Sequence, residues 1–154
     1  EGGVAYRWRR PLVEAEGVGV GGYSRDGIAA VPGASFRQVE LFEMPAGLNF
    51  GAAVAYYPQC DTAEDRMAIP TLVLIGELDD WSPIRLCEWW MQRRNGQGAS
   101  VKLVVYPEAF HGFDNPGIRN GMDFTFGHWL KYDPEAAARS AGEMRAFLAD
   151  RLSN

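Results

Sequence analysis

Four short apolar runs constrain the fold of this chain more than any other feature of its 154 residues. They are VGVGGY (18–23), AAVAYY (52–57), TLVLIG (71–76) and VKLVVY (101–106). Each has the length of a buried strand and is rich in β-branched, aliphatic or aromatic residues. The last two runs are continuous rather than alternating, which is typical of strands that are covered on both faces.

Two other segments have the pattern of amphipathic helices. Residues 83–94 carry apolar side chains at helical spacing, and the sequence NGQG at 95–98 is a stop signal. The sequence DPE at 133–135 is typical of a helix start, and an apolar stripe continues through residues 137–152. Strands that alternate with helices predict an α/β fold with a mostly parallel sheet of about four strands and flanking helices.

Size and charge exclude several classes of protein. A mass of 17.0 kDa indicates a single domain over residues 1–154. The 15 basic and 20 acidic residues give a net charge of −5, which argues against nucleic-acid and membrane partners. No apolar run approaches the ~18 residues of a membrane span. Cys60 and Cys87 have no metal or redox spacing, so we expect no disulfide and a reducing, cytoplasmic location.

The glycine-rich stretch GVGVGGYSRDG at 17–27 fits two different motifs. From Gly17 it matches G-x-G-x-x-G, a dinucleotide-binding turn, but no convincing strand precedes that glycine, so we expect no bound cofactor. From Gly22 it is close to G-x-S-x-G, a sharp turn that presents a nucleophilic serine, here Ser24. A serine in such a turn is usually only a turn residue. Which reading applies to Ser24 depends on whether the rest of the chain supplies the partners that a nucleophilic serine needs.

A nucleophilic serine requires a histidine that takes its proton and a carboxylate that orients the histidine. Asp79 follows the third apolar run and His111 follows the fourth. Ser24, Asp79 and His111 therefore each come at the carboxyl end of an expected strand, and those ends share one edge of a parallel sheet. Taken singly, Asp79 could cap the next helix and His111 could be an ordinary loop histidine. The second histidine, His128, is expected to have a structural or substrate-side role.

Aromatic residues are frequent near these positions. They could line an apolar substrate pocket, although aromatic residues more often belong to the core. The set is Trp81, Trp89, Trp90, Phe110, Phe113 and Trp129.

From about Gly17 to the C-terminus the sequence resembles the dienelactone hydrolase family of the α/β-hydrolase superfamily. The blocks that carry the resemblance are GYSRDG, AAVAYYPQC, PTLVLIGELDDWSP, VVYPEAFHGFD and YDPEAAARSAGEMRAFLADRL. The spacing of Gly76, Asp79 and Pro83 is a specific part of it. The resemblance implies a three-layer α/β-hydrolase-like fold and the hydrolysis of small carboxylic esters or lactones without a metal or other cofactor.

The resemblance also implies roles for single residues. Ser24 would be the nucleophile, His111 the general base and Asp79 its orienting acid, and the backbone N–H of Arg25 would donate to the oxyanion. Asp26 departs from the family, because it stands where the family carries a glycine.

The N-terminal part of the chain is the second departure from the family. Only 16 residues precede Gly17, fewer than the family's earlier strands require. We therefore expect a shortened sheet in which residues 18–23 form an open edge, and a homodimer formed through that edge. The alternative function is that of a truncated, catalytically impaired relative that acts as a binding or assembly protein.

Overall fold

The computed structural model describes residues 18–23, 50–118 and 122–152, with the backbone alone for residue 18 and residues 122–125. The strands and helices that follow belong to this part of the chain. They are β1 (Val18–Tyr23), β2 (Phe50–Tyr56), the 3₁₀ helix η1 (Cys60–Thr62), β3 (Thr71–Gly76), α4 (Ile84–Arg94), β4 (Val101–Tyr106), β5 (Met122–Thr125), β6 (His128–Lys131) and α5 (Pro134–Leu152).

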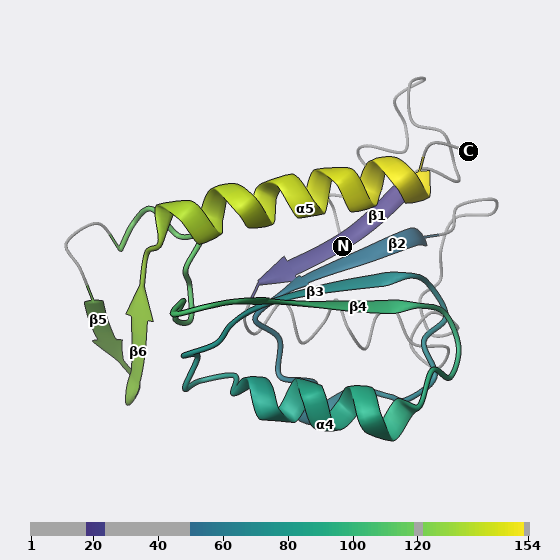
Figure 1. Ribbon diagram of the computed structural model, residues 1–154, viewed down its shortest axis with the longest axis horizontal. Coiled ribbons are helices and arrows are strands. Elements are labelled where there is room, and N and C mark those ends of the chain that lie inside the picture. Colours follow the sequence, from purple (N-terminus) through teal and green to yellow (C-terminus); the bar gives the residue numbers. More distant parts are fainter. Residues whose placement is uncertain (1–17, 24–49, 119–121, 153–154) are drawn as a thin grey trace.

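The first four strands form one parallel sheet in the order β1-β2-β3-β4. All four lie where the apolar runs predicted strands, and the expected α/β class with a four-stranded parallel sheet is confirmed. Because every strand is parallel, the carboxyl ends of β1, β2, β3 and β4 meet at a single edge (Figure 1).

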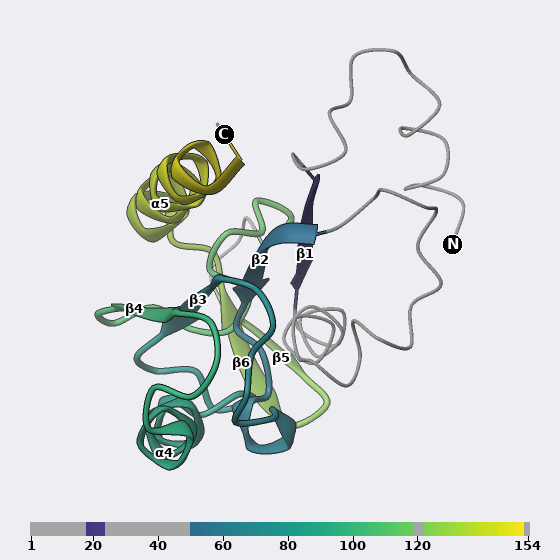
Figure 2. The ribbon, with the colours of Figure 1, turned by 90° about the vertical axis from the view of Figure 1, so that its right-hand side faces the viewer.

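Helices cover both faces of the sheet, which gives the expected three layers. Helix α5 lies along one face and contacts β1, β2 and β3, whereas α4 lies on the other side (Figures 1 and 2). All residues of β3 and the last five of β2 are buried. Their continuous apolar sequences are explained by this double cover.

The helix ends follow the sequence signals. The carboxylate of Asp133 accepts the N–H groups of Glu135 and Ala136, each at 2.9 Å, and so caps the start of α5. Helix α4 ends at Arg94, and its C-cap residue Asn95 has a left-handed φ of 44°. Among the described residues no helix is long and apolar enough to cross a membrane.

The two cysteines correct one expectation. Cys60 and Cys87 form a disulfide, with a sequence separation of 27 residues, whereas the sequence predicted none. The bond forms because η1, which follows β2, packs against α4 in the folded chain. Two cysteines this far apart give no local signal of their pairing.

The β5–β6 hairpin was not expected from the sequence. The strands are antiparallel and are joined by Phe126 and Gly127, which have φ angles of 50° and 86°. The hairpin lies beyond the carboxyl edge of the sheet (Figure 1). Its signal was a glycine between two short runs of alternating residues, and strands of four residues are too short for that alternation to stand out.

Candidate active site

The loops after β3 and β4 bring Asp79 and His111 together. The N–H of Leu78 donates to the carbonyl of Ala109 at 2.9 Å, which ties the two loops to each other. A Cβ atom at Gly76 would collide with the backbone of Ala109. The glycine at the end of β3 is therefore needed for the close approach of the loop that carries His111.

Asp79 and His111 form a buried pair. His111 Nδ1 lies 2.9 Å from Asp79 Oδ2, and the two side chains are 3% and 0% exposed. The other carboxylate oxygen of Asp79 accepts the backbone N–H groups of Trp81 at 3.0 Å and Ser82 at 2.7 Å. Three N–H groups thus hold the carboxylate in one orientation.

The contacts of the two residues bear on the alternatives considered for them. Helix α4 has Pro83 at its N-cap and no side-chain cap hydrogen bond, so Asp79 is not the cap of that helix. His111 faces a carboxylate instead of being an ordinary loop histidine. An N–H on Nδ1 that donates to Asp79 leaves the basic lone pair of the imidazole on Nε2, the arrangement of a general base.

Two aromatic rings pack against the imidazole of His111. The ring centroid of Tyr57 lies 4.4 Å away, and Trp81 stacks on the imidazole with a centroid distance of 5.0 Å. Tyr57 follows β2 directly and has a positive φ of 39°, which is uncommon for a bulky residue. The carboxyl ends of β2, β3 and β4 therefore all supply side chains to this site.

Tyr57 also connects the site to Asp114. Its hydroxyl donates to Asp114 Oδ1 at 2.8 Å. Burial, with the nearby charge of Asp114, raises the pKa of Tyr57 far above its usual range, so the phenol stays protonated and remains a donor. Burial also raises the pKa of Asp114, although the hydrogen bond from Tyr57 and the charge of His111 act in the opposite direction.

His128 is the first residue of β6, and it contacts Trp81 rather than the buried pair. Its ring stacks on Trp81 with a centroid distance of 4.9 Å, and its Nδ1 lies 3.7 Å from Asp80 Oδ1. Asp80 also accepts the backbone N–H of Trp129 at 3.1 Å. Asp79 and Asp80 thus have different partners, because the first contacts His111 and the second contacts the hairpin.

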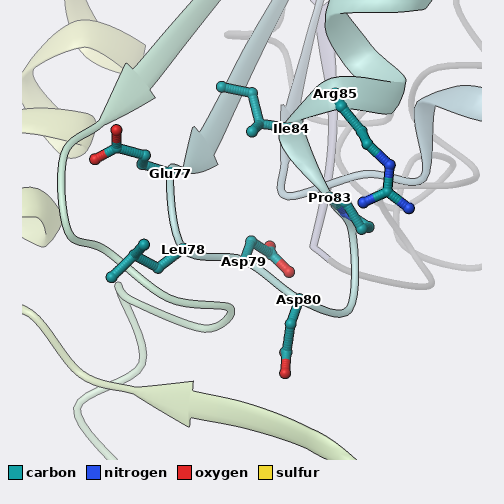
Figure 3. A pocket seen from close by; sticks show the side chains of 7 residues that line it. All are labelled: Glu77, Leu78, Asp79, Asp80, Pro83, Ile84 and Arg85. Atoms are coloured by element: carbon teal, nitrogen blue, oxygen red, sulfur yellow. The ribbon is translucent and has the colours of Figure 1, made fainter.

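A cavity of about 420 Å³ opens beside the turn between β3 and α4. It is lined by residues 77–80 and 83–85, and Figure 3 shows these side chains around the turn. Asp79 is the only member of the buried pair among them. The cavity thus belongs to the β3–α4 turn.

The predicted nucleophile Ser24, the oxyanion donor Arg25 and Asp26 lie outside the described residues. Tyr23, the last residue of β1, immediately precedes Ser24 in the chain, and its ring stacks on Tyr56 at 4.8 Å. The structure therefore fixes the strand that leads to Ser24 and brings Asp79 and His111 together at the same edge of the sheet.

The aromatic residues considered from sequence divide into different groups. Trp81 lies against His111, Trp90 and Phe113 are buried in the core, and Trp89 and Trp129 are exposed. Sequence reasoning missed Tyr57 and Asp114 as site residues. Their only signals were a position just after the second apolar run for Tyr57 and closeness to His111 in the chain for Asp114.

Comparison with known proteins gives a family match over most of the chain. The sequence model of the dienelactone hydrolase family matches residues 10–152. No match was found among curated proteins.

Several solved structures share the fold. A Klebsiella pneumoniae protein assigned as a dienelactone hydrolase is 24% identical, with a TM-score of 0.69 over 95% of this chain and 57% of that one. A dienelactone hydrolase-like promiscuous phosphotriesterase from metagenomic libraries is 19% identical, with a TM-score of 0.64 over 94% and 56%. A thermophilic esterase from Thermogutta terrifontis is 18% identical, with a TM-score of 0.64 over 86% and 55%. The chain thus spans somewhat more than half the length of these structures.

Proposed function

Because the chain belongs to the dienelactone hydrolase family, we propose that it hydrolyses small carboxylic esters or lactones with Ser24 as nucleophile. The observation that carries the proposal is the buried contact of 2.9 Å between His111 Nδ1 and Asp79 Oδ2. A histidine held in this way is the base that a serine hydroxyl needs, and Ser24 follows the strand that ends at the same edge of the sheet.

The proposed reaction has two steps. Ser24 Oγ attacks the ester carbonyl carbon while His111 Nε2 takes the hydroxyl proton, and the C–O bond to the alcohol then breaks as His111 returns that proton to the leaving oxygen. Water next attacks the acyl-serine, His111 takes a proton from it, and the carboxylic acid leaves as Ser24 recovers its proton. Asp79 holds the imidazole and stabilises its positive charge in both steps.

The backbone N–H of Arg25 is the proposed donor to the oxyanion. Asp26 stands beside this donor in the sequence, where the family pattern has a glycine. A carboxylate near a developing oxyanion opposes the negative charge. We therefore expect Asp26 to give slower ester hydrolysis than a glycine at this position would give.

The test is the hydrolysis of 4-nitrophenyl acetate by wild-type protein and by three single variants. Ser24→Ala removes the nucleophile and is expected to lower kcat by about 10⁴-fold or more. Asp79→Asn is expected to lower kcat by about 10⁴-fold, because an amide at this position favours the wrong tautomer of His111. The matched control is Asp80→Asn, which makes the same change one residue further on, where the carboxylate faces the hairpin.

The outcomes separate the parts of the proposal. Equal rates for wild type and Ser24→Ala would remove Ser24 from the mechanism. Equal losses for Asp79→Asn and Asp80→Asn would remove the special role of the buried pair. A wild-type protein without ester hydrolysis would favour the alternative function, a binding or assembly protein, which the edge position of β1 in the described sheet supports.

The cytoplasmic location remains a prediction. The disulfide between Cys60 and Cys87 counts against it, because such bonds persist in oxidising compartments. Thiol labelling of the protein in intact cells distinguishes the two states of the pair.

A further inference from the structure

The tip of the β5–β6 hairpin carries an aromatic ring in an unusual position. Phe126 is 87% exposed and has a positive φ of 50°. Bulky residues rarely adopt this backbone conformation, and tight hairpin turns of this kind favour asparagine or glycine instead. The exposed ring therefore does not stabilise the turn, and the residues around it indicate another role.

The hairpin is attached to both loops that form the buried pair. The N–H of Trp129 donates to Asp80 at 3.1 Å, and the N–H of Lys131 donates to the carbonyl of His111 at 3.3 Å. The ring of His128 also stacks on Trp81. These contacts fix the hairpin beside the site.

Phe126 and Trp81 form a corner of two aromatic rings next to His111. Their centroids lie 6.1 Å apart and their planes meet at 65°. Trp81 in turn stacks on His111 at 5.0 Å. A group that contacts Phe126 and the edge of Trp81 is therefore separated from the imidazole of His111 by the ring of Trp81.

We propose that Phe126 and Trp81 bind an aromatic group of the ester substrate, in its acyl or alcohol part. The inference rests on the proposed esterase function and names the substrate class. Offset and edge-to-face contacts between aromatic rings are favourable, and the exposed face of Phe126 offers such a contact without any rearrangement of the buried pair. Exposed apolar side chains beside a catalytic group are typical of substrate-binding surfaces.

The charges near the corner agree with a neutral aromatic group. Asp80 is engaged by the N–H of Trp129, and the ammonium group of Lys131 lies over the ring of Phe110 at 5.9 Å. At the tip of the hairpin, the ring of Phe126 is exposed.

The first test compares kcat/KM for ethyl acetate, phenyl acetate and ethyl phenylacetate. Because phenyl acetate is intrinsically more reactive, the informative quantity is how a variant changes the ratio of each aromatic ester to ethyl acetate. Phe126→Ala is expected to lower this ratio about three- to tenfold for at least one aromatic ester. The matched control is Trp89→Ala, since Trp89 is likewise an exposed aromatic residue but lies on α4 beneath Arg93.

Unchanged ratios in Phe126→Ala for both aromatic esters would overturn the inference, including the case in which all three esters lose activity equally. If the sedimentation of Phe126→Ala also changes while these ratios do not, the tip would be assigned to self-association. An unchanged ratio in the Trp89→Ala control, together with a lowered ratio in Phe126→Ala, supports the inference.

A second test separates this inference from the proposed function. Acetanilide and N-ethylacetamide are amide analogues of two of the esters, and their binding is measured by NMR titration without any need for turnover. Wild-type protein is expected to bind acetanilide more tightly, and Phe126→Ala is expected to lose this preference. If the wild type cleaves no ester but keeps the preference, only the esterase proposal fails. If it cleaves esters but lacks the preference, only the aromatic site fails.

Discussion

His111 is held by contacts of two kinds, a hydrogen bond with Asp79 and the packing of two aromatic rings, Tyr57 and Trp81. The contact with Asp79 could be expected, because each residue follows an apolar run and parallel strands bring those positions to one edge. The ring contacts with Tyr57 and Trp81 could not, because they depend on side-chain directions that no periodicity encodes. Ser24 remains a prediction, since it lies outside the described residues.

Asp114 leads to a prediction about stability and pH. Burial raises its pKa above the usual value in the folded state, so the folded protein holds this proton more tightly than the unfolded chain does. The stabilisation that the proton provides is fully present below the unfolded pKa, and it is lost as the pH rises through the folded pKa. Asp114→Asn keeps an oxygen acceptor for the Tyr57 hydroxyl but does not titrate.

Urea unfolding of wild type and Asp114→Asn between pH 3 and 7 tests this prediction. The wild type is expected to lose stability relative to the variant as the pH rises above the ordinary range of an aspartate. At pH 7 the variant is expected to be at least as stable as the wild type. A difference in unfolding free energy that stays constant over the whole range would contradict the raised pKa.

The disulfide joins two elements that each follow a site residue in the chain. Cys60 belongs to η1, which follows Tyr57 by a few residues, and Cys87 belongs to α4, which follows Asp79. For a closed loop of 27 residues the chain-entropy model gives a stabilisation of about 3–4 kcal/mol. The double variant Cys60→Ala/Cys87→Ala is thus expected to lose roughly this much free energy of unfolding.

Urea unfolding with and without a reductant checks this value. The wild type in reductant is expected to approach the double variant, and the double variant itself is expected to be insensitive to the reductant. Equal stability of oxidised wild type and double variant would show that the bond does not stabilise the fold.

The strands and helices differ, for physical reasons, in how closely their bounds could be predicted from the sequence. The strands β3 and β4 could be placed to the residue, because both are continuous apolar runs. Helix α5 was marked by Asp133, whose side chain caps it. The hairpin was missed because its strands have four residues each and its turn begins with Phe126 rather than a typical turn residue.

At the scale of the whole molecule, the sheet determines where the chemistry can occur. All four strands of the described sheet are parallel, so one edge collects the residues that follow β2, β3 and β4. The order β1-β2-β3-β4 also leaves β1 paired only with β2 among the described strands. An edge strand offers unpaired backbone groups to another chain.

For the whole molecule we therefore predict a homodimer in which two chains associate through β1. Gly21 is exposed on β1, and a Cβ there would meet the Val54 carbonyl at an ordinary 3.6 Å, so Gly21→Lys fits the fold. A lysine on an edge strand opposes pairing between two edges. We expect sedimentation velocity to show a dimer for the wild type and a monomer for Gly21→Lys.

The control for charge is Gly142→Lys, on helix α5, where an added Cβ meets nothing within 4 Å. This variant changes the net charge by the same amount but leaves β1 intact, so it is expected to remain a dimer. A wild type that sediments as a monomer at all concentrations would contradict the prediction. Equal dissociation of both lysine variants would show that association depends on net charge, because only Gly21→Lys alters the edge of the sheet.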